Sequence, residues 1–403
     1  MKICYVTSQT PYGKGEQFIL PEINKLNERN NQVTIIPVRP DAELATGEEA
    51  RSLAGSTIRE SLISFKIFAI SLKVFFLNPI KGLKILKDIF TDSRGVGKII
   101  KNICVMPKGL YISQLIREKG IEHIHCHWAS TSSTMGYIAS LLSGVPFSIT
   151  AHRWDIAENN MLRVKAKHCK FIRVIDDPGY EEMIEFIGDE HKYKCTKIHV
   201  GVDIKSNNVE NVITKEKSNS FIMAMAANFV EKKGHIYLIE ALKDLKKKAY
   251  DFKLYLYGSG ELEDELKSLV KKYDLEKEVI FAGKIAHDAL LEKYYNREID
   301  CFVLPSIVTE SGEKEGIPVS LMEAMAAKIP VVSTYTGGIY ELIDGKTGLI
   351  VEEKNSKVLE EAIESLINDI DLRKNLAEEG AKKVSEEFHI STVAKMLEEL
   401  FLS

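Results

Sequence analysis

Short apolar runs alternate with stretches of helical spacing along almost the whole chain, and this pattern restricts the fold more than any other feature. The alternation starts at Lys2–Ser8, stops at a polar stretch rich in Asn, Lys and Ser (204–219), and restarts at Phe221–Ala226. Strands that alternate with helices form parallel sheets, which bind ligands at the carboxyl edge of their strands. The sequence therefore predicts an α/β protein with two doubly wound domains, a linker, and a ligand cleft between the domains.

The composition sets the class of protein. The 403 residues are 45% hydrophobic and 28% charged, enough for two domains with substantial cores, and the net charge of −4 indicates no general affinity for nucleic acid. The six cysteines are scattered without a Cys-x-x-Cys pair, which favours reduced thiols in the cytosol over disulfides or a zinc site. We expect no signal peptide, because an apolar strand follows Met1 at once. We also expect no membrane-spanning helix, since no uncharged apolar run reaches about 18–20 residues.

A basic and apolar segment at 58–110 interrupts the alternation in the first half. It carries ten lysines and arginines against three acidic residues, a net charge of +7, among many Phe, Ile and Leu residues. Basic apolar helices of this kind can lie in a membrane interface. The alternative is a helical insertion that packs on its own domain with its lysines in water. The sequence leaves both interpretations open.

Two carboxylates eight positions apart, Glu315 and Glu323, flank a predicted junction between a loop and a helix. The apolar run at 301–305 is typical of a buried strand, and Pro318 suits the first turn of a helix, where its missing N–H costs nothing. Free N–H groups at a helix start attract anions. A phosphate site beside carboxylates suits a sugar nucleotide, whose hydroxyls the carboxylates would bind. The alternative is an acidic loop that caps an ordinary helix.

Histidines gather at strands of the first half. His123, His125 and His127 alternate onto one face of a predicted strand, and His152 follows the strand at 147–150. Three imidazoles on one face could bind a metal, but no carboxylate or cysteine stands at ligand spacing, so we predict no metal site. The position just past a parallel strand is where α/β sheets bind ligands, which makes His152 a candidate. The alternative is a loop histidine of no special role.

Together these motifs resemble the family 4 glycosyltransferases, nearly from end to end. The pair Glu315 and Glu323, with the trailing Glu-Ala-Met-Ala, is similar to the family's Glu-x7-Glu signature, and 230–234 (Val-Glu-Lys-Lys-Gly) to its phosphate-binding Lys-Gly loop. Residues 336–342 and 344–349 resemble its next two signatures. The segments most similar to the subgroup that builds exopolysaccharides such as colanic acid and amylovoran are 18–23, 125–128, 147–152 and 313–318.

The resemblance implies the GT-B fold, in which two Rossmann-like domains face each other across a cleft. Residues 1–205, with the insertion at 58–110, would bind the acceptor and be completed by a C-terminal helix at 388–403. Residues 206–387 would bind the nucleotide sugar. The implied enzyme is a retaining, metal-independent hexosyltransferase without a cofactor, in the cytoplasm or on the inner face of the membrane. It would transfer a sugar from a UDP- or GDP-sugar to a glycan acceptor, lipid-linked, for surface polysaccharide.

The resemblance also implies roles for single residues. Glu315 would hold hydroxyls of the donor sugar, Glu323 would accept hydrogen bonds from the ribose, and Lys233 would neutralise the leaving diphosphate. His152 would contact the donor sugar near the reacting carbon. The remaining implied donor-binding positions are Gly15, Asn228, Lys284, Ile285, Gly316, Ile317, Pro318 and Val319.

One departure from the family's pattern falls at Asn228, where the family usually has arginine. The change removes one guanidinium that would bind phosphate. Three explanations stay open: Lys232 or Arg153 substitutes for it, the rate is low, or the donor is bound differently. Two other functions also stay open, a nucleotide-sugar epimerase on the same fold and a non-catalytic relative that binds glycans or lipids.

Overall fold

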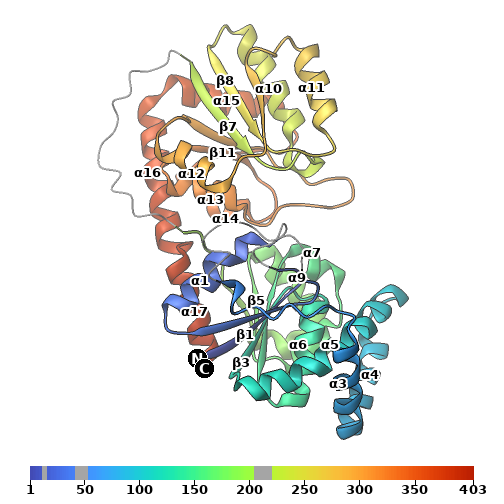
Figure 1. Ribbon diagram of the computed structural model, residues 1–403. Helices are drawn as coiled ribbons and strands as arrows, with labels where there is room; N and C mark the ends of the chain where they lie inside the picture. The colour runs from blue at the N-terminus through green and yellow to red at the C-terminus, as the bar shows by residue number, and fades with distance from the viewer. Residues whose placement is uncertain (11–15, 41–52, 204–219) are drawn as a thin grey trace. The chain divides into compact units, whose positions relative to one another are not determined.

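The computed structural model describes residues 1–10, 16–40, 53–203 and 220–403, and these divide into two compact units (Figure 1). Unit 1 comprises Met1–Gly201 and Ile390–Ser403, and unit 2 comprises Val202–His389. Within the described residues each unit is built on a six-stranded sheet with parallel pairing throughout. The predicted α/β class with two doubly wound sheets is confirmed.

Unit 1 has the strand order β2-β1-β3-β4-β5-β6. Its strands are β1 (Lys2–Thr7), β2 (Gln32–Pro37), β3 (His123–His127), β4 (Phe147–Ala151), β5 (Ile172–Val174) and β6 (Cys195–Lys197). Its helices are η1 (Gln17–Ile19), α1 (Leu20–Glu28), α3 (Phe65–Leu77), α4 (Pro79–Asp92), α5 (Val96–Lys119), α6 (Thr131–Ser143), α7 (Arg153–Glu158), α8 (Leu162–His168), α9 (Asp177–Ile187), η2 (Asp189–Lys194) and α17 (Ile390–Leu402). The chain leaves β1 in one direction to β2 and in the other to β3, so the order reverses between β1 and β3.

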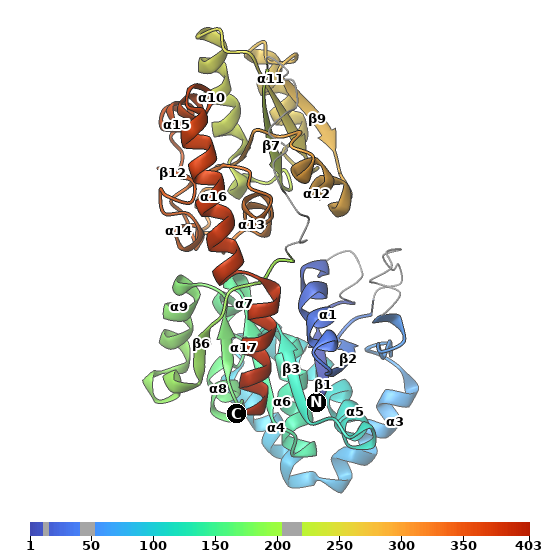
Figure 2. The same cartoon turned by 90° about the vertical axis from the view of Figure 1, so that its left-hand side faces the viewer.

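The C-terminal helix α17 packs against α1 in unit 1 (Figure 2). Its buried residues Val393, Leu397 and Phe401 join the apolar core on one face of the sheet. Glu398 accepts hydrogen bonds from the Arg29 guanidinium, at 2.6 Å and 2.8 Å. The last helix of the chain thus completes the first sheet rather than the second.

The segment at 58–110 forms helices α3 and α4 and most of α5. Helix α5 packs on both α6 and α3, and Ile67, Ile85 and Ile89 are buried against this core. Lys108, fully buried, donates hydrogen bonds to the carbonyls of Pro37 (2.6 Å) and Glu60 (2.7 Å). The insertion is therefore anchored on its own sheet along one side.

Unit 2 has the order β12-β11-β10-β7-β8-β9. Its strands are β7 (Phe221–Ala226), β8 (Phe252–Tyr257), β9 (Val279–Gly283), β10 (Cys301–Leu304), β11 (Val331–Thr334) and β12 (Leu349–Val351). Its helices are η3 (Glu231–Lys233), α10 (His235–Lys247), α11 (Glu263–Lys272), α12 (His287–Tyr295), α13 (Val319–Ala326), α14 (Ile339–Leu342), α15 (Ser356–Asn368) and α16 (Ile370–Glu387). Strand β10, central in the sheet, is buried along its whole length, which explains its continuous apolar sequence.

The last strand of unit 1, β6, is short and ends at Lys197 (Cys195–Lys197). The carbonyls of Ile198 and His199 accept hydrogen bonds from the buried Arg173 side chain. These carbonyls therefore supply the acceptors that a buried guanidinium needs. The predicted linker at 204–219 lies outside the described residues.

Buried histidines make the stability of both units sensitive to acid. Burial, with Lys170 near one ring and Lys233 near the other, lowers the pKa of His123 and of His235 to about 3. In the unfolded chain both rings titrate near pH 6.5, so their contribution to stability is present above that pH and is lost as the pH falls toward 3. At pH 5 each costs about 2 kcal/mol of unfolding free energy. We expect His123→Phe to lower the loss of stability between pH 7 and pH 5, measured by urea denaturation. An unchanged pH slope would contradict this account.

Candidate active site

Helix α13 starts with unsatisfied backbone groups. The sequence predicts Pro318 in the first turn of the helix, whereas in the structure it is the residue just before the helix. Its carbonyl accepts hydrogen bonds from the N–H groups of Leu321 (3.1 Å) and Met322 (3.4 Å). Within the described residues no side chain caps this end. The N–H groups of Val319 and Ser320 therefore have no partner inside the helix, as expected for a first turn, and can bind an anion.

Glu315 lies in the loop before this helix, between two lysines of the short 3-10 helix η3. Its Oε2 is 3.0 Å from Nζ of Lys233, and its Oε1 is 3.6 Å from Nζ of Lys232. The Glu315 side chain is 11% exposed and that of Lys233 16%, whereas that of Lys232 is 32% exposed. Glu315 Oε1 makes no hydrogen bond within the described part of the chain. The structure thus brings two predicted site residues together and adds Lys232.

Two glycines hold these loops in place. At Gly337 (φ +57°), a Cβ would lie 1.9 Å from the carbonyl oxygen of Glu315. At Gly234 (φ +71°), a Cβ would lie 1.9 Å from the carbonyl oxygen of Pro305. No side chain fits at either position, and the positive φ is also costly for other residues. The backbone N–H of Ile307 donates to Lys232 O at 2.8 Å, which ties the lysine loop to the end of β10.

Glu323, one turn into α13, has a partner that the sequence did not indicate. Its Oε1 lies 2.6 Å from Nε2 of His287, the first residue of α12. The Glu323 side chain is 12% exposed and that of His287 60%. Burial, and after it the charge of Glu323, raises the pKa of Tyr294 well above its usual range. Glu323 is therefore a largely enclosed carboxylate with one oxygen hydrogen-bonded to His287.

The other candidates in unit 2 range from exposed to buried. Lys284 and Asn228 are exposed, and Ile285 is half-buried. Gly316 and Val319 are half-buried, and Ile317 and Pro318 are buried. Sequence reasoning missed the hydroxyls of Ser306 and Thr336, which are buried and make no hydrogen bond to described residues. For Thr336 the sequence did contain an indication, because this residue begins the Thr-Gly-Gly motif, whose turn packs on Glu315.

His152 lies in unit 1, at the end of β4, where the sequence placed it. Its Nε2 is 2.8 Å from Nε2 of His127, and its ring centroid is 4.4 Å from that of Trp128. Burial, and after it the neighbouring His127 and Arg173, holds the pKa of His152 well below its usual range, so the ring is neutral at pH 7. Its backbone N–H donates to Asp155 Oδ1 at 2.6 Å. Gly15 lies outside the described residues.

A cluster of buried polar side chains lies on and beside the histidine strand β3. Glu22, His125 and His127 bring ligand atoms within 4.8 Å of one another. The Glu22 carboxylate already accepts from the Tyr5 hydroxyl (2.9 Å) and the Arg173 guanidinium (2.5 Å). His125 is hydrogen-bonded through both ring nitrogens to hydroxyl groups. This group is therefore explained as an internal ion-pair network, and the absence of a metal site remains a prediction.

The family model described as "Glycosyl transferases group 1" matches residues 207–383. The putative colanic acid biosynthesis glycosyltransferase WcaL of Salmonella typhimurium is 36% identical over 183 residues, which cover 44% of this chain and 44% of that protein. The chain thus matches less than half the length of this relative. The uncharacterized glycosyltransferase MJ1178 of Methanocaldococcus jannaschii is 30% identical over 349 residues, covering 80% of this chain and 93% of that protein.

Solved structures agree with the fold. The crystal structure of Alr3699/HepE from Anabaena in complex with UDP has a TM-score of 0.71 at 17% identity, and the likeness covers 99% of each chain. At this identity the likeness concerns the fold alone. Because the match to MJ1178 spans nearly that whole protein and the family model covers most of unit 2, this chain belongs to the group 1 glycosyl transferases, the family that its motifs resemble.

Proposed function

We propose that the protein is a retaining glycosyltransferase that moves a sugar from a nucleoside-diphosphate sugar to a lipid-linked glycan, in the assembly of a surface polysaccharide. The observation that carries the proposal is the meeting of Glu315, Lys232 and Lys233 in one unit that also contains the open start of α13. Two cations and free N–H groups suit a diphosphate, and a carboxylate between them suits sugar hydroxyls. The relatedness to colanic acid and capsular polysaccharide enzymes supports the class of product.

In this proposal each residue binds a different part of the donor. Lys233 and the N–H groups at the start of α13 stabilise the negative charge that grows on the leaving diphosphate. Glu315 orients the sugar through its hydroxyls, Glu323 binds the ribose, and Lys284 with Ile285 contacts the base. His152, neutral at pH 7, offers a hydrogen bond near the reacting carbon. Because the related Anabaena protein was crystallised with UDP, UDP-sugars come first among the donors to test.

The test is donor turnover by the purified protein. We expect release of a nucleoside diphosphate from at least one UDP- or GDP-sugar, faster when a lipid-linked oligosaccharide is added. An epimerase would instead return a changed nucleotide sugar without any acceptor. A protein that binds donors or vesicles but turns over none of them would be a non-catalytic relative, and the proposal would then be abandoned.

We propose that Lys232 binds the donor phosphate that an arginine at position 228 usually binds in this family. It reaches Glu315, whereas Arg153 belongs to unit 1 and is 3.3 Å from Glu182. We expect Lys232→Met to lower kcat/KM for the donor roughly tenfold, the value of one charged hydrogen bond. Asn228→Arg, added to this variant, is expected to restore part of the rate. If Lys232→Met turns over the donor like the wild type, another group fills the role.

The surface of the insertion carries the proposed contact with the membrane. Among the described residues, most of the large exposed apolar side chains lie just before α3, on α3 and α4, and at the start of α5: Ile63, Phe65, Phe68, Leu72, Phe76, Leu77, Ile80, Leu83, Phe90, Val96 and Ile100. Phe65 is 88% exposed and Ile80 84%. Such a face beside exposed lysines suits an anionic lipid surface. No described helix is both long enough and apolar enough to span a bilayer.

Vesicle sedimentation tests this contact. We expect Phe65→Ser with Phe76→Ser to lower binding to vesicles of phosphatidylglycerol and phosphatidylethanolamine roughly tenfold or more, since each buried aromatic ring contributes about 1 kcal/mol or more. Lys73→Glu with Lys87→Glu should weaken binding only where the vesicles are anionic. Tyr193→Ser, at an exposed aromatic position outside the insertion, is the matched control. Unchanged binding in the Phe variant would make the face structural, and a loss of self-association instead would identify a second copy as its partner.

A further inference from the structure

The contact between His287 and Glu323 has no part in the function proposed so far. Nε2 of His287 lies 2.6 Å from Oε1 of Glu323, although the two residues belong to different helices, α12 and α13. An ionised carboxylate only accepts hydrogen bonds, so Nε2 carries the proton of this bond. The Glu323 side chain is 12% exposed. A hydrogen bond to a largely enclosed, charged acceptor is stronger than one between two exposed side chains.

His287 is the partner that holds the Glu323 carboxylate among the described residues. Oε2 of Glu323 forms no hydrogen bond or ion pair with the described part of the chain. The Tyr294 hydroxyl is near enough for the charge of Glu323 to raise the pKa of Tyr294, but it is buried without a hydrogen bond to any described residue. A glutamate side chain has several rotatable bonds, so without His287 the carboxylate could adopt other rotamers.

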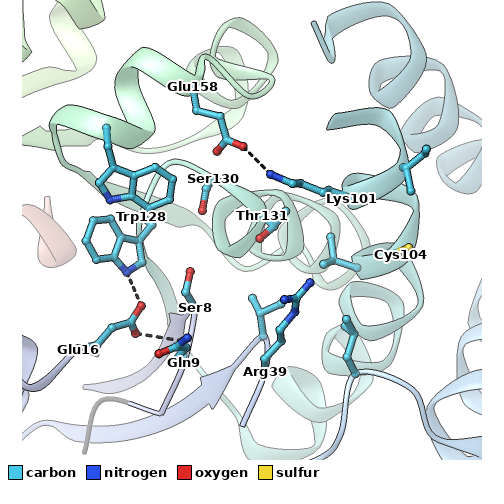
Figure 3. A pocket seen from close by; sticks show the side chains of 15 residues that line it. Ser8, Gln9, Glu16, Arg39, Lys101, Cys104, Trp128, Ser130, Thr131 and Glu158 are labelled. Carbon is cyan, nitrogen blue, oxygen red and sulfur yellow. Dashed lines mark hydrogen bonds and ion pairs between the residues drawn. The ribbon is translucent and has the colours of Figure 1, made fainter. Parts of the chain in front are cut away.

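The carboxylates around a cavity of about 560 Å³ in unit 1 are held in a similar way (Figure 3). Glu16 Oε1 accepts a hydrogen bond from the indole N–H of Trp128, a residue with φ +91°, at 2.6 Å. Glu158 Oε1 lies 3.4 Å from Nζ of Lys101 on α5. In both cases a donor from a distant part of the sequence restricts one oxygen of the carboxylate. The same arrangement restricts the carboxylate on α13 in unit 2.

The position of Glu323 on α13 places its second oxygen near a nucleotide bound at the helix start. Glu323 comes four residues after Val319, so the two residues lie on one face of the helix, about 5.4 Å apart along its axis. A diphosphate on the free N–H groups of Val319 and Ser320 would thus have its ribose beside Glu323. Because His287 binds Oε1, Oε2 is the oxygen that remains to accept from ribose hydroxyls.

We propose that His287 is a positioning residue of the ribose site and fixes Glu323 so that Oε2 accepts hydrogen bonds from the ribose hydroxyls. It thereby sets the preference for ribonucleotide over deoxyribonucleotide donors. This role rests on the function proposed above and adds the residue that makes Glu323 selective. A site built to bind a hydroxyl group rejects an analogue without it most strongly when the acceptor cannot turn away. His287 acts on donor binding and not on the transfer step.

Isothermal titration calorimetry of the full chain with UDP and GDP, each beside its 2′-deoxy and 3′-deoxy analogue, tests this role. We expect the wild type to bind one ribonucleotide roughly tenfold or more tightly than at least one of its deoxy analogues. His287→Leu should reduce this preference to about twofold. His287→Gln should keep most of it, because the amide nitrogen can donate in place of Nε2. Glu292→Leu, at an exposed position of the same helix, is the matched control.

Two further readouts separate positioning from a general effect on the fold. His287→Leu should raise the KM for the donor and leave kcat within about twofold. Added to Glu323→Gln, it should change the Kd little further, since its effect passes through the carboxylate. An unchanged Tm in His287→Leu shows that the variant is folded.

The role of His287 is overturned if His287→Leu keeps the ribose preference, if it binds ribonucleotides more tightly, or if the Leu and Gln variants lose the preference equally. These results leave the glycosyltransferase function standing wherever a nucleotide sugar is turned over. Conversely, a protein that shows the expected Kd changes but turns over no nucleotide sugar supports the role of His287 and refutes the proposed function. If the wild type binds no nucleotide at all, both are refuted.

Discussion

Glu315→Gln is expected to lower kcat/KM for sugar transfer by about 10²–10³-fold, comparable to the cost of removing one preorganised hydrogen-bonding group from an active site. The carboxylate lies 3.0 Å from Lys233 and 3.6 Å from Lys232. The amide has the same shape as the carboxylate but no negative charge. It therefore no longer holds the two ammonium groups in place, and it is a weaker acceptor of hydrogen bonds from sugar hydroxyls. Initial rates of nucleoside diphosphate release measure the effect.

The control for this variant is Glu313→Gln. Glu313 is exposed in the same loop and is held by its backbone, since its N–H donates to the Thr309 hydroxyl at 2.9 Å. It carries the same charge two positions away and is expected to leave the rate within about twofold. Equal losses in both variants would mean that the loop responds to net charge rather than to Glu315 itself.

Gly337→Ala is expected to reduce activity as much as the loss of Glu315 and to lower the Tm as well. The new Cβ would lie 1.9 Å from the Glu315 carbonyl oxygen, so the loop must move, and φ +57° adds strain. We expect a loss of roughly 2–4 kcal/mol in unfolding free energy, measured by thermal denaturation, together with a fall in kcat.

Gly345→Ala separates the effect of backbone strain from the effect of the steric collision. Gly345 has φ +84°, but its Cβ would meet nothing within 4 Å. This variant carries the strain without the collision and should lose about 1 kcal/mol and little activity. If both alanine variants keep full activity, the packing of Gly337 on Glu315 has no part in positioning the carboxylate.

The residues of the proposed donor site could be predicted from the sequence because their constraints are local. Pro318 and the apolar residues after it fix the helix start, and the family pattern names Glu315 and Lys233 without any distance. The ion pair between Lys232 and Glu315 follows only from the fold, since Lys232 lies in η3 and Glu315 in the loop before α13. His287 carried no signal, because its contact with Glu323 depends on how α12 packs against α13.

The cavity in unit 1 was out of reach for a different reason. Its residues come from segments that lie far apart in the sequence, between Ser8 and Glu158, and nothing in the sequence around Trp128 indicates a positive φ. The histidine strand was predicted correctly as a strand with one polar face. The partners of those histidines, Ser148 for His123 and His125, and His152 for His127, depend on the register of β3 against β4.

The most direct test of the central claim is a thermal-shift screen of UDP- and GDP-sugars against the wild type and Glu323→Gln. Binding to the folded state alone raises the melting temperature, by an amount that grows with ligand concentration. We predict that at least one nucleotide sugar raises the Tm of the wild type and that Glu323→Gln loses most of this rise. No rise with any nucleotide sugar, or an equal rise in the variant, would contradict a donor site at Glu323.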